Sequence, residues 1–104
     1  MVEKQSIRKT LIKDIPLKSG LILKKGSIVE VRSLVPESLQ SCQVTINNES
    51  YRLRYTSVFK SPSMNQLEKW TFDDIVKTPA GSKVEPDGYD EYNFPSWLLV
   101  LGMI

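Results

Sequence analysis

The 104-residue sequence contains no histidine and only one cysteine. Histidine is the usual general base near neutral pH, the proton acceptor of serine-type triads and a common metal ligand. A phosphate-binding glycine loop is also missing, because Gly81, Gly88 and Gly102 are too widely spaced. We therefore expect no catalytic residue, no cofactor and no metal, and we expect that the protein is not an enzyme.

The single cysteine, Cys42, cannot form an internal disulfide, which is typical of a reducing compartment. We expect a small buried thiol there, because a reactive thiolate needs a neighbouring base or cation. Residues 1–13 lack the apolar centre of a signal peptide, and no apolar run approaches the ~20 residues of a membrane span. The expected location is the cytoplasm, with no membrane partner.

Charge is divided unevenly along the chain, although the net charge is only +2. Residues 1–60 contain eleven lysines and arginines against five acids, a balance of +6. Residues 61–104 contain three lysines against seven acids, a balance of −4. The two parts of the chain therefore carry net charges of opposite sign.

Short runs of β-branched residues predict antiparallel strands in the first sixty residues. The clearest strand is 28–32, and segments 43–46 and 50–53 flank Asn47-Asn48-Glu49. Asparagine tolerates the positive φ angles of a tight hairpin turn, so these segments predict a hairpin. The pattern resembles an SH3-like barrel, with its closing one-turn helix and short last strand at 55–59.

After residue 60 the apolar spacing changes to that of a helix. Ser63 and Gln66 form a capping-box pair, and the helix is expected to end near residues 73–74. The sequence Glu85-Pro86-Asp87-Gly88 favours a tight turn, which predicts a hairpin with Val84 and Tyr89 on its two arms. Residues 97–101 fit either a helical turn capped by a serine or a buried strand.

These elements predict an α+β, mostly β fold. We expect a small antiparallel SH3-like barrel in residues 1–60, followed in residues 61–104 by a short helix and a C-terminal β-hairpin. The two parts are expected to pack as one domain, because 104 residues support only one modest core.

The C-terminal block carries a resemblance to a group of proteins. Residues 84–88 and 95–102, with Ile104, are similar to the Val-Glu-Pro-Asp-Gly … Pro-Ser-Trp-Leu-Leu-x-Leu-Gly-x-Ile ending of small uncharacterised bacterial and phage proteins. This resemblance covers about a quarter of the chain and implies no defined activity. It does imply a phage or mobile-element origin.

Two functional hypotheses follow. The first is a protein–protein interaction module, acting on a host factor or in assembly, whose contact residues lie in the acidic, aromatic C-terminal segment: Tyr89, Asp90, Glu91, Tyr92, Phe94 and Trp97. The alternative is a nucleic-acid-binding accessory or regulatory protein that uses cations of the basic part: Lys24, Lys25, Arg52 and Arg54.

The arrangement of side chains on a strand bears on this alternative. Arg52 and Arg54 should point to one face of their strand, with Tyr51, Leu53 and Tyr55 on the other. Cations and aromatic rings would then be separated. We therefore expect the rings in the core, an arrangement that weakens this strand as a platform for base stacking.

Overall fold

The computed structural model describes residues 6–104, so the first five residues of the predicted 1–60 unit lie outside the described residues. The fold is α+β and mostly β, with 32% strand and 17% helix. All strand pairs are antiparallel. Within residues 6–104 the sheets stay open and no barrel closes.

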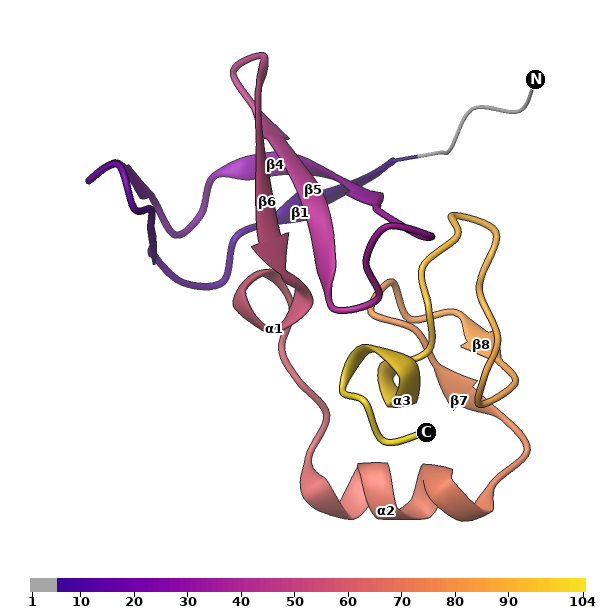
Figure 1. Cartoon of the computed structure of the whole chain (residues 1–104). Helices are drawn as coiled ribbons and strands as arrows, with labels where there is room; N and C mark the ends of the chain where they lie inside the picture. Colours follow the sequence, from indigo (N-terminus) through magenta and orange to yellow (C-terminus); the bar gives the residue numbers. More distant parts are fainter. Residues whose placement is uncertain (1–5) are drawn as a thin grey trace, which may run out of the picture.

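A four-stranded sheet forms the first part of the molecule (Figure 1). Its strands, in spatial order, are β1 (Ile7–Thr10), β4 (Ile28–Ser33), β5 (Ser41–Ile46) and β6 (Glu49–Arg54). A small hairpin of β2 (Ile15–Pro16) and β3 (Ile22–Leu23) lies between β1 and β4 in sequence, and the one-turn helix α1 (Tyr55–Val58) follows β6.

The predicted hairpin is confirmed in the β5–β6 pair. Asn47 and Asn48 form its turn with φ angles of 51° and 65°, the left-handed conformation that asparagine adopts more readily than most residues. The turn fixes the register, in which Gln43 lies opposite Arg52. Every second side chain of β6 therefore faces solvent.

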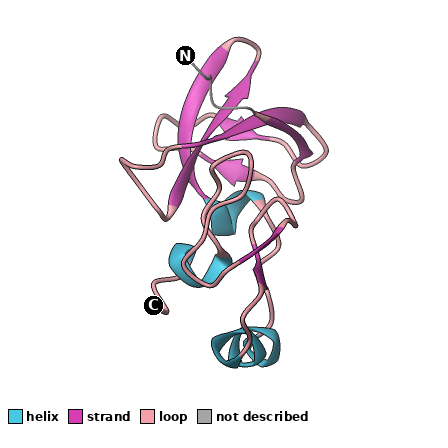
Figure 2. Cartoon of the chain, turned by 90° about the vertical axis from the view of Figure 1, so that its right-hand side faces the viewer, coloured by secondary structure: helices cyan, strands magenta, loops and turns pink. Residues whose placement is uncertain are grey.

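The second part contains two helices and a short hairpin: α2 (Met64–Phe72), β7 (Val76–Lys77), β8 (Lys83–Val84) and α3 (Trp97–Val100). The predicted start of α2 is confirmed, because the Ser63 Oγ accepts a hydrogen bond from the Gln66 amide at 3.1 Å. Figure 2 shows α2 at the end of the molecule away from the sheet, with α3 and β7 between them.

The expected hairpin between Val84 and Tyr89 is wrong. The Gly88 amide does bond to the Glu85 carbonyl at 2.8 Å, as a tight turn requires. Beyond the turn, however, Tyr89 forms an isolated antiparallel β-bridge with Pro95. Strand β8 pairs instead with the preceding strand β7, and residues 78–82 connect the two strands. The C-terminal hairpin is thus residues 76–84.

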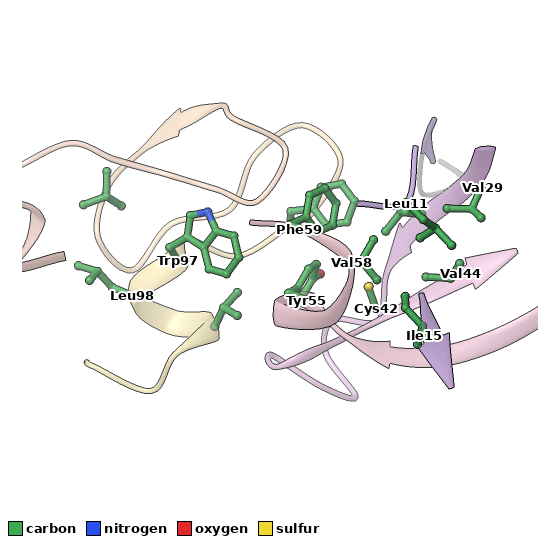
Figure 3. Close-up of a cluster of buried hydrophobic side chains, with 14 of the residues drawn as sticks. Leu11, Ile15, Val29, Cys42, Val44, Tyr55, Val58, Phe59, Trp97 and Leu98 are labelled. Carbon is green, nitrogen blue, oxygen red and sulfur yellow. The ribbon is translucent and has the colours of Figure 1, made fainter. Parts of the chain in front are cut away.

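One continuous hydrophobic core joins the two parts. Figure 3 shows Tyr55 and Phe59 between side chains of the sheet and those of α3. The Tyr55 ring meets Phe94 edge-on, with 5.8 Å between centroids and 82° between planes. Helix α3 contributes Trp97, Leu98 and Val100, all buried. Residues 97–100 therefore form a helix of the core, whereas residues 102–104 are exposed.

Candidate functional site

The predicted contact residues lie in and just after one loop, residues 85–93, which we call the acidic loop. The Tyr89 side chain is 44% exposed and Glu91 is also exposed, whereas Asp90 and Tyr92 are partly buried. Phe94 is 0% and Trp97 4% exposed. The last two therefore support the loop from the core, and only the first four reach the surface.

The Asp90 carboxylate organises the acidic loop from inside. Its Oδ1 accepts hydrogen bonds from the backbone amides of Tyr92, at 2.9 Å, and Phe94, at 3.0 Å. Its Oδ2 accepts a 2.6 Å bond from the hydroxyl of Thr78, a buried residue of the β7–β8 turn. Charge-assisted bonds of this kind are the stronger ones. Asp90 thus ties the loop to a second element.

Backbone bonds close the same loop. The Asp90 amide donates to the Phe94 carbonyl at 3.0 Å, and the Asn93 amide donates to the Asp90 carbonyl at 2.9 Å. Asn93 has φ of 66°, a conformation that asparagine tolerates. Below them, the Tyr92 and Phe94 rings pack with 6.1 Å between centroids. The loop is therefore held by its own backbone as well as by the core.

Ser96 anchors the other end of the acidic loop to α3. Its hydroxyl donates to the Pro86 carbonyl and accepts from the Leu99 amide at 3.2 Å, as an N-cap does. The Ser96 amide also donates to the Gly88 carbonyl at 3.1 Å. The helical alternative for residues 97–101 is confirmed, and this cap joins it to the turn.

With Asp90 turned inward, the outward charges of the loop are Glu85, Asp87 and Glu91, and its exposed ring is Tyr89. None of these three carboxylates forms an ion pair with any cation of residues 6–104. Across the same described stretch, no three acidic or thiol groups gather closely enough to hold a metal ion. The surface offers unpaired negative charge and one exposed aromatic side chain.

The basic residues are brought together only in part. Arg52 and Arg54 are exposed on the solvent face of β6, as strand alternation predicted. The other face of this segment carries Tyr51, Leu53 and Tyr55. Lys24 and Lys25 lie in the turn before β4, and Lys24 lines a hollow with Tyr51 and Glu49 that does not include either arginine.

Two arginines that the sequence hypothesis omitted share the face of Arg52 and Arg54. Arg32 of β4 and Arg52 of β6 both lie opposite Gln43 of the intervening strand β5. Arg8 of β1 is exposed opposite Glu30 on the same face. The alternation in residues 28–32 could have placed Arg32 outward, but the pairing of β1 with β4 was needed to place Arg8.

Two buried polar groups lie in the core behind the sheet. Cys42 is fully buried, its Sγ lies 3.5 Å from the Leu53 carbonyl oxygen, and burial raises the pKa of its thiol to about 12. The expected buried thiol is therefore present. Burial also raises the pKa of Tyr55, whose hydroxyl oxygen is the one buried side-chain nitrogen or oxygen of the described chain without a hydrogen-bond partner.

Comparison with protein-family models, curated proteins and solved structures found no match to this chain. Among the helices of residues 6–104, none has the length and apolar character needed to cross a membrane.

Proposed function

We propose that this chain is a non-enzymatic protein–protein interaction module and that the acidic loop is its contact surface. The observation that carries this proposal is the inward-turned Asp90 carboxylate, which holds the loop by three hydrogen bonds before any partner arrives. A loop that is already ordered loses little conformational entropy on binding. Such preorganisation is what a recognition loop needs.

The outward side chains define the chemistry of the partner. Tyr89 is a rigid, amphipathic ring of the kind enriched at binding hot spots. Glu85, Asp87 and Glu91, which are exposed in the same loop, add negative charge, which steers a basic protein surface toward the loop. The partner that we propose is therefore a protein with a basic surface around an apolar slot for one tyrosine.

The resemblance of the C-terminal block to phage proteins supplies a setting for this proposal. In that setting the chain acts in the host cytoplasm, on a host factor or in assembly. We also propose that β1 to β6 with α1 form an incomplete SH3-like arrangement, a likeness that carries no function by itself. The strand order and the one-turn helix after β6 support it, although Phe59 forms no closing strand.

The proposal is tested by affinity capture from the native host with the wild-type chain and with a Tyr89→Ala, Glu91→Lys variant. We expect one basic protein to be retained by the wild type and lost by the variant. The control is Phe72→Ala on α2, an 89% exposed aromatic remote from the loop in sequence. Equal capture by all three chains would refute the acidic loop as the contact surface.

A further inference from the structure

The solvent face of the four-stranded sheet gathers four arginines from three strands. They are Arg8 on β1, Arg32 on β4, and Arg52 and Arg54 on β6, which we call the arginine face. Arg32 and Arg52 face each other across a single strand, because both pair with Gln43. Neighbouring strands lie ~4.8 Å apart, so the backbones at these two positions are about 10 Å apart.

The guanidinium groups of this face are not neutralised within the fold. None of the four forms an ion pair with a carboxylate elsewhere in the described chain. Two acids lie nearby: Glu30 is opposite Arg8, and Glu37 shares a hollow of ≈ 490 Å³ with Arg32 and Arg52. Counted with these two acids, the surface keeps a net positive charge.

The side chains of Gln43, Thr45 and Ser50 on this face are neutral and bonded to one another. The Gln43 Nε2 donates to the Ser50 Oγ at 3.0 Å, and the Ser50 and Thr45 hydroxyls are also 3.0 Å apart. Tyr51 lines the same hollow as Arg32 and Arg52, but strand alternation directs its side chain to the opposite face of β6. The surface is therefore cationic and polar, with no aromatic anchor.

We propose that the arginine face binds the phosphate backbone of duplex nucleic acid without sequence preference. Guanidinium groups match phosphate oxygens in charge and in bidentate geometry. A protein partner would need an apolar or aromatic anchor at the centre of the contact, and a single strand would need rings for base stacking. The centre of the arginine face, around Gln43, offers neither, because the exposed Ile28 lies at the end of β4 beside Arg8. Phosphates require neither.

This inference is independent of the proposed function of the acidic loop. The two surfaces carry opposite charge and use different residues, so substitutions in one leave the other intact. The assignment also changes the basic residues expected to bind. Arg8 and Arg32 enter the site, whereas Lys24 and Lys25 do not belong to the face.

The test is the salt dependence of binding to a fluorescent 20-base-pair DNA duplex, measured by anisotropy with the full chain. If all four arginines contact phosphates, the affinity should fall about 150-fold between 50 and 200 mM salt, since the logarithmic slope is about −0.9 per contact. For an Arg32→Gln, Arg52→Gln variant the slope should halve, and the same salt change should weaken binding only about 12-fold.

The control variant is Lys77→Gln, Lys83→Gln, which removes the same charge from the β7–β8 hairpin. It should keep the wild-type slope, and thermal unfolding should show that both variants are folded. The proposal is overturned if the duplex does not bind at 50 mM salt. It is also overturned if the arginine variant and the lysine variant show the same slope of affinity against salt. It is equally overturned if polyglutamate displaces the duplex at matched charge concentration, because the face would then take any acidic polymer.

Discussion

At the scale of single residues, Asp90 has the largest structural role in the C-terminal part. The sequence marked it as an exposed acid of a contact loop, but the structure turns its carboxylate inward onto two amides and one hydroxyl. Replacing a carboxylate that accepts from three donors lowers the stability of the fold, because each donor then loses its hydrogen-bond partner. Asp90 therefore shapes the contact surface from beneath it.

Replacing Asp90 with alanine should lower the free energy of unfolding by about 2–3 kcal/mol, since it leaves the Thr78 hydroxyl and two amides unsatisfied. Urea unfolding measures this loss. The matched control is Asp87→Ala in the same loop, whose exposed side chain should contribute within about 0.5 kcal/mol. Equal effects of the two substitutions would show that Asp90 is not the organising residue.

The buried Cys42 thiol should make the free energy of unfolding depend on pH. Burial raises the pKa of its thiol from 9.0 to about 12, so the unfolded chain loses its proton before the folded one. The corresponding stability is present in full below about pH 9 and is lost as the pH rises toward 12. Unfolding free energies measured across this range should fall less steeply for Cys42→Ala. Parallel curves for the two proteins would contradict this assignment.

Some of these residue-level features could be predicted from the sequence, because they depend only on local chemistry. The buried thiol and the outward Arg52 and Arg54 follow from local chemistry and from the period of two in a strand. The addition of Arg8 to the same face required knowing which strands pair. The inward role of Asp90 required knowing that Thr78, twelve residues earlier, would lie beside it.

At the scale of elements, the predictions that were confirmed are those with a local turn or cap signal in the sequence. The β5–β6 hairpin and the start of α2 were predicted because their signals are local: asparagines in a tight turn and a serine cap. The 76–84 hairpin was missed because its strands are two residues each, too short for any periodicity. Its turn at Pro79–Gly81 has the composition of an ordinary helix breaker.

The two serine caps give a comparison between elements. Ser96 is fully buried and links α3 to the Pro86 carbonyl, whereas Ser63 caps α2 at the surface. We expect Ser96→Ala to cost about 2 kcal/mol and Ser63→Ala about 1 kcal/mol or less, because only the first also leaves a partly buried carbonyl without its donor. Thermal and urea unfolding measure both. A larger effect at Ser63 would contradict the anchoring role of Ser96.

At the scale of the whole molecule, the sheet and the C-terminal part share one core. Tyr55 of α1 packs on Phe94, and Trp97, Leu98 and Val100 belong to the same buried cluster. Figure 3 shows Tyr55, Trp97 and Leu98 in this cluster. Burial of each large apolar side chain contributes about 1.5–3 kcal/mol, a substantial share of the stability of a small domain. Neither part keeps a complete core without the other.

Removing residues 97–104 should therefore unfold the whole chain, including the sheet. Circular dichroism on heating should show no cooperative transition in this truncated protein. The control truncation removes only residues 102–104, which are exposed, and should remain folded. A cooperative transition in the protein that lacks residues 97–104 would show that the sheet is an independent domain and that α3 is not part of its core.

The proposed contact surface requires an ordered acidic loop in the free protein, and amide hydrogen exchange measures this order residue by residue. We predict that the Tyr92 and Phe94 amides, which donate to the Asp90 carboxylate, are protected in the wild type. In Asp90→Ala their protection should be lost, while the amides between β4 and β5 remain slow. Rapid exchange of both loop amides in the wild-type protein would contradict a preformed contact surface.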